Sequence, residues 1–94
     1  MRINVTFRGI AHLYNVMNKK RTIDVHIAGN TVRDVINALL KKYGAVIRQT
    51  LLDAEGNIDM ELRVVHNERT FLEYAQRMDT PLNDGDMLWF MAVG

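Results

Sequence analysis

The sequence predicts an α+β fold, in which a mixed sheet of about four to five strands packs on one main helix. Apolar and polar residues alternate in four separate segments, and this two-residue period is that of a half-buried strand. Between the second and third of these segments the period changes to that of an amphipathic helix. A hairpin, a crossing helix and further strands therefore follow one another along the chain.

The first two strands are expected at residues 1–8 and 21–27. The apolar members of the alternation are Ile3, Val5 and Phe7 in the first strand and Ile23, Val25 and Ile27 in the second. Residues 9–20, which connect them, are expected to form a loop. We expect the two strands to pair antiparallel, because consecutive strands joined by a modest loop usually form a hairpin.

The main helix is expected at residues 31–43. Its apolar residues fall at helical spacings on one face: Val32, Val35, Ile36, Leu39, Leu40 and Tyr43. Thr31 with Asp34 three residues later approximates a capping box, and Gly44 suits the end of a helix. A second, shorter helix is indicated by the apolar residues of the segment 46–52, before the turn-rich residues 53–57.

The remaining strands are expected after that turn. Met60, Leu62 and Val64 alternate as a third strand that ends near residues 67–68. Residues 71–78 fit a helical turn as well as an irregular edge strand, and both alternatives stay open. The last strand is expected at about residues 87–92, with Leu88 and Phe90 in the core.

The order of these elements is that of the β-grasp, or ubiquitin-like, layout, in which the last strand lies centrally and parallel to the first. We expect one β-grasp domain over residues 1–94, with a C-terminal tail that ends at Gly94. Trp89 and Met91 have the opposite parity to the core residues, so they are expected on the open face of the sheet beside Thr6 and Arg8. A large aromatic and a methionine side by side favour a partner-docking patch over coverage by the chain's own loops.

Composition excludes several classes of function. The formal net charge is only +1, so no bulk electrostatic attraction to nucleic acid or to an anionic membrane is expected. Cysteine and serine are absent, which removes thiolate metal sites, disulfides and the common acyl-transfer nucleophiles. We expect no bound cofactor or metal, no membrane-spanning segment or secretory leader, and a cytoplasmic location.

The last ten residues are the most informative for function, because an apolar strand runs to a bare glycine. A terminal carboxylate on a residue without a side chain is a group that a partner enzyme can draw into a narrow active site. Domain ends more often trail into polar sequence.

Three segments of the chain carry a family resemblance. The turn over residues 80–86 with the following strand and its Ala92-Val93-Gly94 end resembles the MoaD/ThiS group of ubiquitin-like sulfur carrier proteins. Tyr43-Gly44 with Leu51-Leu52-Asp53 and Gly56 resembles the middle of the molybdopterin-synthase small subunits, and residues 64–67 resemble their third strand and turn. The similarity extends over essentially the whole chain, and the turn is its most specific part.

The resemblance implies a carrier that is not an enzyme alone. In that group a partner of the ubiquitin-activating type adenylates the terminal glycine, which becomes a thiocarboxylate after sulfur arrives from a donor such as a cysteine desulfurase or a rhodanese. The role of reactive residue falls on Gly94, and Trp89, Met91, Val93 and Arg8 are the expected docking residues. Molybdopterin or tungsten cofactor synthesis, with a molybdopterin-synthase large subunit as a further partner, is the favoured pathway.

The chain departs from the group at one position. The group ends in Gly-Gly, whereas Val93 precedes Gly94 here, and valine has a β-carbon and restricted backbone angles. Either a further glycine follows in the natural product, or a single glycine suffices, or the chemistry has been lost. Two alternatives to a sulfur carrier therefore stay open: a ubiquitin-like protein modifier and a noncovalent β-grasp interaction module.

Overall fold

The computed structural model describes residues 1–92 and has the expected α+β architecture. In chain order the elements are β1 Arg2–Arg8, α1 Ala11–Val16, β2 Thr22–His26, α2 Val32–Tyr43, α3 Ala45–Leu51, β3 Leu62–His66, β4 Thr70–Phe71, the short 3₁₀ helix η1 Arg77–Asp79 and β5 Met87–Ala92. The strands form one five-stranded sheet in the order β2-β1-β5-β3-β4.

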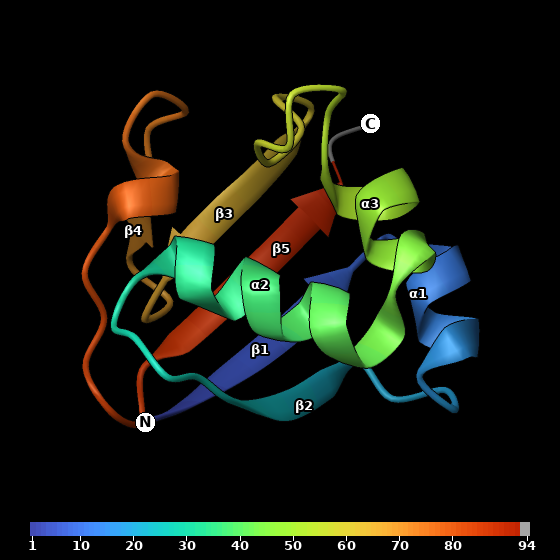
Figure 1. Ribbon diagram of the computed structural model, residues 1–94, viewed down its shortest axis with the longest axis horizontal. Coiled ribbons are helices and arrows are strands. Elements are labelled where there is room, and N and C mark those ends of the chain that lie inside the picture. The colour runs from blue at the N-terminus through green and yellow to red at the C-terminus, as the bar shows by residue number, and fades with distance from the viewer. Residues whose placement is uncertain (93–94) are drawn as a thin grey trace.

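The last strand lies in the middle of this sheet, as the sequence predicts. β5 pairs parallel with β1 on one side and antiparallel with β3 on the other, and Figure 1 shows it running between them. β1 and β2 form the predicted antiparallel hairpin. The end of β5 is thus held between two neighbours, which fixes the place from which the chain leaves the sheet.

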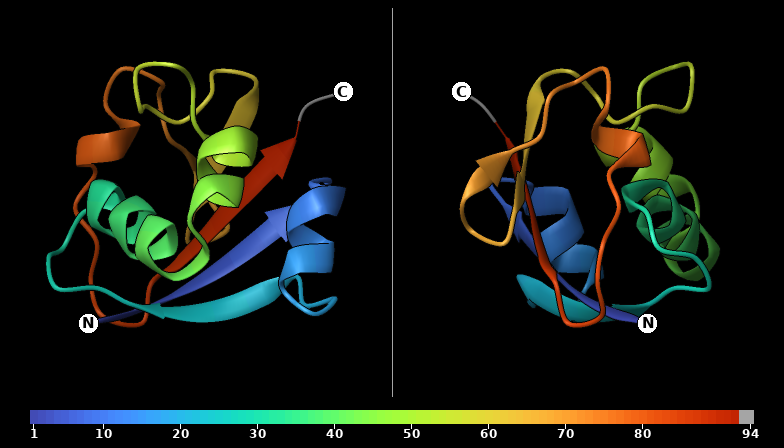
Figure 2. Two further views of the ribbon diagram at one scale, coloured as in Figure 1. Left: turned by 45° about the vertical axis from the view of Figure 1, so that its right-hand side comes forward. Right: turned by 90° about the vertical axis from the view of Figure 1, so that its left-hand side faces the viewer.

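One face of the sheet is covered by helices and holds the core. Figure 2 shows α2 and α3 on the same side of the sheet, and α2 contacts β2, α3 and η1. Leu88 and Phe90 of β5 are fully buried on this side, as predicted, and the Phe90 ring stacks on Phe7 with 5.7 Å between centroids. None of the helices in the described residues 1–92 covers the opposite face.

The predicted capping box of the main helix is confirmed. Thr31 is the N-cap of α2, its side-chain oxygen accepts from the Asp34 amide, and Asp34 accepts in return from the Thr31 amide at 3.0 Å. Gly44 ends the helix with φ +68°, a conformation that disfavours residues with a side chain. The shorter helix is α3, which begins directly after this glycine.

The loop expected at residues 9–20 is wrong in part, because α1 forms within it. This helix is only six residues long, its N-cap Ile10 offers no side-chain hydrogen bond, and Leu13 is its one buried residue. So short a helix is not stable alone, and it carries no period from which a sequence pattern can be recognised. The burial of Leu13 in the core stabilises it instead.

The second difference lies around β3. Met60, expected in that strand, precedes it and is 74% exposed, while β3 begins at Leu62. The strand ends as expected, because Asn67 and Glu68 both have positive φ and form a tight turn of the hairpin type. Both alternatives for residues 71–78 occur in part, since β4 ends at Phe71 and η1 supplies a helical turn.

Among the helices of residues 1–92, none has the length and apolar character needed to cross a membrane.

Candidate functional site

The open face of the sheet is the main candidate for binding a partner. Strand parity places on it three arginines, Arg2, Arg8 and Arg63, against one carboxylate, that of Asp24. Apolar side chains lie between these arginines. The face is therefore positively charged around an apolar centre, although the whole chain carries a formal charge of only +1.

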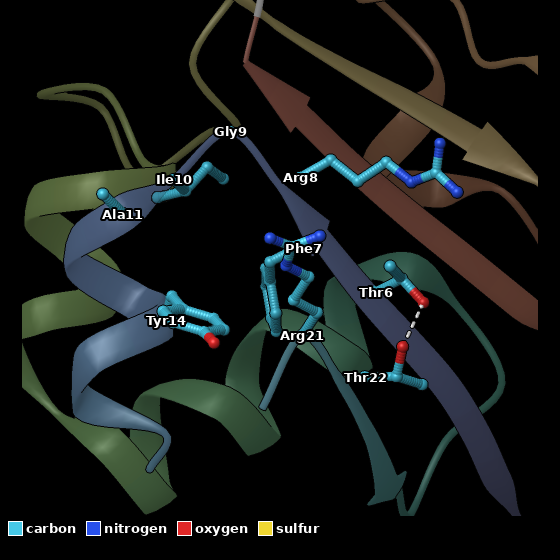
Figure 3. Close-up of a pocket in the computed structure, with 9 residues that line it drawn as sticks. All are labelled: Thr6, Phe7, Arg8, Gly9, Ile10, Ala11, Tyr14, Arg21 and Thr22. Atoms are coloured by element: carbon cyan, nitrogen blue, oxygen red, sulfur yellow. Dashed lines mark hydrogen bonds between the residues drawn. The ribbon is translucent and has the colours of Figure 1, made fainter. Parts of the chain in front are cut away.

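The centre of this face is built by β5, as predicted. Trp89 pairs with Thr6 of β1, and Met91 pairs with Arg8. The Arg8 guanidinium lies over the Trp89 ring at 4.3 Å from its centroid, and Figure 3 shows Arg8 pointing across β5. Trp89 and Met91 are half-buried rather than fully exposed. Arg8 thus covers part of the tryptophan through a cation–π contact that also keeps a charge at this position.

The structure adds residues that the sequence analysis missed. Val65 of β3 pairs with Trp89 on one side and with Phe71 of β4 on the other, so these three residues form a row across the sheet. Phe71 is 59% exposed, and the Arg63 guanidinium lies 5.7 Å from its ring centroid. Val65 is only 4% exposed because its two larger neighbours cover it. Phe71 belongs to residues 71–78, for which the sequence pattern left two alternatives open. Only the pairing of β4 with β3 shows that its side chain lies on the open face of the sheet.

We call this set of seven residues the aromatic face: Arg8, Arg63, Val65, Phe71, Trp89, Met91 and Thr6.

The turn before β5 aligns the strand with its neighbours. The Asp86 carboxylate accepts from the Asn83 amide at 2.9 Å and from the Asn67 side chain at 3.2 Å, and it lies 2.7 Å from Nε2 of His66. Burial by itself would raise the pKa of Asp86. These hydrogen bonds outweigh burial, and the pKa of the carboxyl lies below its usual value.

The same turn also holds β1. The Asp84 carboxylate accepts from the Arg2 amide at 2.7 Å, the Gly85 amide donates to the Arg2 carbonyl at 2.8 Å, and Gly85 has φ +86°. These contacts explain the composition of the Asn83-Asp84-Gly85-Asp86 segment. Its two carboxylates accept backbone and side-chain hydrogen bonds, so the segment acts by positioning β5.

The far end of β5 lies against the turn that follows β1. Gly9 has φ +73°, and a β-carbon at this position would lie 3.4 Å from the Cβ of Ala92. Ala92 pairs with Leu62 on the other side. The predicted reactive residue Gly94 and the predicted docking residue Val93 lie outside the described residues. The strand that leads to them ends between β1 and β3, at the border of the aromatic face.

A buried arginine supports the segment that connects β4 to β5. Arg77 is 3% exposed and donates to the carbonyl oxygens of Leu62, Ile58 and Asp59 at 2.8, 2.6 and 2.6 Å. Burial lowers the pKa of Arg77 from its usual range. No side-chain pattern in the sequence marks Arg77, because its partners are backbone groups of a distant loop. Its role is structural.

Clusters of three or more histidine, cysteine, aspartate or glutamate side chains that could hold a metal are not found within residues 1–92.

Comparison with solved structures confirms the β-grasp fold. The chain is similar to SAMP1, small archaeal modifier protein 1, of Haloferax volcanii, with 19% identity, a TM-score of 0.77, and coverage of 100% of this chain and 97% of that one. It is similar to a chain of the Amycolatopsis orientalis BexX/CysO complex, with 16% identity, a TM-score of 0.77, and coverage of 98% and 96%. Urm1 of Trypanosoma brucei matches with 23% identity, a TM-score of 0.74, and coverage of 99% and 92%.

No protein-family model matches the sequence, and no curated protein gives a significant match. The resemblance to small ubiquitin-like proteins is confirmed by these structural neighbours at the level of the fold.

Proposed function

We propose that this chain is a ubiquitin-like carrier whose glycine carboxylate is activated by a partner enzyme and converted to a thiocarboxylate. The observation that carries the proposal is the position of β5. The strand that precedes Val93 and Gly94 is the central strand of a β-grasp sheet, and its outward residues Trp89 and Met91 form the middle of the aromatic face. A partner that docks on this face meets the chain where it leaves the sheet.

Two further observations support the proposal. Residues 80–86 resemble the turn of the MoaD/ThiS carriers, and the hydrogen bonds of Asp84 and Asp86 give that turn a positioning role. Among the structural neighbours, one is called a modifier protein and another was solved in a complex, BexX/CysO. A small β-grasp chain that works with larger partners fits both.

The chemistry needs no catalytic side chain from this protein. A free carboxylate does not react with a sulfide, so an ATP-using enzyme first joins it to AMP and releases pyrophosphate. The sulfur donor's persulfide or sulfide then attacks the acyl carbon, and AMP leaves. A persulfide adduct must in addition be cleaved by a thiol reductant to leave the thiocarboxylate on Gly94.

The resemblance to the MoaD/ThiS carriers implies the partners for this chemistry. We propose an adenylating enzyme of the ubiquitin-activating type, a sulfur donor such as a cysteine desulfurase or a rhodanese, and a molybdopterin-synthase large subunit that receives the carrier. Molybdopterin or tungsten cofactor synthesis is the pathway favoured by the resemblance of residues 43–56 to the small subunits of that synthase. We propose a cytoplasmic location for the reaction.

The intact mass of the protein tests the proposal directly. After incubation with an adenylating enzyme, ATP and a sulfur donor, we expect the mass increase that accompanies replacement of one oxygen by sulfur. Fragmentation should place the change at Gly94. A variant that lacks Gly94 is the matched control and should show no increase.

A second pair of variants isolates the penultimate position. Val93→Gly and a chain with one additional terminal glycine restore two glycines at the end, so each should react at least as fast as the natural sequence. If none of these chains is adenylated while an established carrier reacts in the same assay, the carrier proposal is wrong. Retained binding to a partner through the aromatic face would then favour a noncovalent interaction module.

A further inference from the structure

We propose that the free edge of β2 binds an extended, acidic peptide segment of another protein, which adds to the sheet as a further strand. This edge lies on the other side of β1 from β5, and Arg8 and Thr6 are the residues of the aromatic face that border the groove beside it. Three features carry the inference: unpaired backbone groups, hollows that adjoin along the strand, and an excess of positive charge.

The first feature is the hydrogen-bonding pattern of β2. The Ile27 amide donates to Met1 and the Phe7 amide donates to Arg21, which fixes the phase of the antiparallel ladder. In such a ladder, paired residues alternate between exchanging both hydrogen bonds and exchanging none. The amides and carbonyls of residues 22, 24 and 26 therefore point away from β1, and no residue of the described part of the chain bonds to them. They present a template for a further strand.

The second feature is a series of three hollows along this strand. A hollow of about 770 Å³ borders Arg21 and Thr22 and is walled by Tyr14 of α1, as Figure 3 shows. A second of about 510 Å³ runs from Thr22 to Asp24 beside Lys42 of α2. A third of about 270 Å³ continues from Asp24 to His26.

These hollows adjoin, because the first and second share Thr22, and the second and third share Asp24 and Lys42. Ile23 lines the second hollow, and Val25 with Ala38 and Leu39 lines the third. An added strand directs every second side chain toward the helices. Apolar residues at alternate positions of the partner would fill these hollows.

The third feature is charge. Five cationic side chains line the hollows, Arg8, Lys20, Arg21, Lys41 and Lys42, and Asp24 supplies the single carboxylate among the lining residues. The ion pairs found among residues 1–92 involve none of these five cations. Arg21 and Lys42 rest on the rings of Tyr14 and Tyr43, at 5.5 and 5.4 Å. The partner segment that complements this edge carries carboxylates beside its apolar residues.

The probe for a first experiment is the peptide acetyl-Glu-Val-Thr-Ile-Thr-Val-Glu-amide. Its valines and isoleucine fall on one face of a strand, and both ends are acidic. Binding to the full chain is measured by calorimetry and by amide hydrogen exchange. We expect exchange at Thr22, Asp24 and His26 to slow at least tenfold with saturating peptide, and the affinity to fall as salt is added.

Two variants of one residue test the backbone pairing. Asp24→Pro removes an outward amide and leaves the bonds to β1 in place, because proline is tolerated on the free side of an edge strand. It should weaken peptide binding at least tenfold. Asp24→Ala is the matched control. It keeps the backbone amide and removes the only carboxylate among the residues that line the hollows, so the variant should bind the peptide as tightly as the natural chain or more tightly.

Charge and sequence order are tested separately. Lys42→Glu should weaken binding at least fivefold, whereas Arg69→Glu, on the β3–β4 turn at the opposite edge, should not change it. A peptide of the same composition in which apolar and polar residues do not alternate should bind the chain at least tenfold more weakly. A peptide that is N-methylated at the amides expected to pair with β2 should also bind at least tenfold more weakly. Circular dichroism and urea unfolding verify that each variant is folded.

The proposal is overturned by absence of binding, by equal binding of the non-alternating peptide, or by exchange protection at other amides. It is also overturned if sedimentation shows that the chain dimerises through β2 and that Asp24→Pro restores a monomer. In that case a second copy is the occupant of this edge. None of these outcomes depends on activation of Gly94.

Discussion

Trp89 and Phe90 are adjacent in β5 and lie on opposite faces of the sheet. Phe90 is fully buried against Phe7, so Phe90→Ala removes a large core side chain and leaves a cavity. We expect it to lower the free energy of unfolding by about 3–5 kcal/mol. Urea unfolding followed by circular dichroism measures this loss.

Trp89→Ala should weaken partner binding more than it lowers the stability of the fold. It removes the contact with Arg8 and part of the cover of Val65, which should lower stability by about 1 kcal/mol. The affinity for the proposed adenylating enzyme should fall by about 2 kcal/mol or more, because a central aromatic of an interface often dominates binding. Calorimetry of the complex gives the affinity, and unchanged binding would refute the docking role of Trp89.

The two variants together test the strand register. Unchanged stability of Phe90→Ala would show that the register of β5 is wrong.

Arg77 illustrates a residue whose environment reverses its usual preference for the surface. Its guanidinium donates to the backbone carbonyls of Leu62, Ile58 and Asp59, of which only that of Asp59 is also seen to accept from a loop amide, that of Leu62. Arg77→Ala should therefore lower the free energy of unfolding by about 2–4 kcal/mol. Arg69→Ala, at an exposed position of the neighbouring turn, is the control and should change it by less than about 0.5 kcal/mol. Similar losses in both variants would contradict the structural role of Arg77.

At the scale of an element, the start of α2 depends on one carboxylate. Asp34 accepts from the amides of Asn30 and Thr31 and from the Thr31 hydroxyl, and these bonds lower its pKa. Gly29 leaves no room for a β-carbon beside this carboxylate. Gly29→Ala must therefore displace the Asp34 side chain, so we expect it and Asp34→Ala each to lower stability by about 1 kcal/mol.

A double-mutant cycle distinguishes this mechanism from general strain at Gly29. If Gly29→Ala acts through the Asp34 carboxylate, it should cost much less in a chain that already carries Asp34→Ala. The free energies of unfolding of the four chains give the coupling. Additive losses would show that the two positions act independently.

At the scale of the whole molecule, Asp86 joins β3 and β5 and supports the turn against β1. Its pKa is lower in the folded chain than the usual value of about 3.9 for an aspartate. The unfolded chain therefore binds more protons in acid, so the stability that Asp86 contributes is present above about pH 4 and is lost as the pH falls through the folded pKa.

Urea unfolding from pH 7 to pH 2.5 measures this contribution. Asp86→Asn should be less stable than the natural chain at pH 7, because its amide group cannot accept all the hydrogen bonds that reach the carboxylate. The difference between the two chains should shrink in acid. A constant difference over this pH range would show that the contribution of Asp86 does not depend on its ionisation.

The sequence by itself determined β1, β2, β5 and the main helix, because their periods are local, whereas it placed the start of β3 too early and left β4 open. The alternation of Ile3, Val5 and Phe7 and the spacing of the apolar residues of α2 are present in the residues themselves, and so is the capping box of Thr31 and Asp34. The parity of β5 also placed Trp89 and Met91 on the open face beside Arg8, and the structure has them there.

Only the tertiary structure decided the features that depend on distant partners. α1 is too short to show a period and exists because Leu13 is buried, and Phe71 joins the aromatic face through its pairing with Val65. The burial of Arg77 depends on carbonyls 15 to 19 residues away along the chain. The free edge of β2 likewise becomes a groove only where α1 and α2 lie beside it. Local patterns specify which face a side chain takes, whereas long-range packing specifies what that face meets.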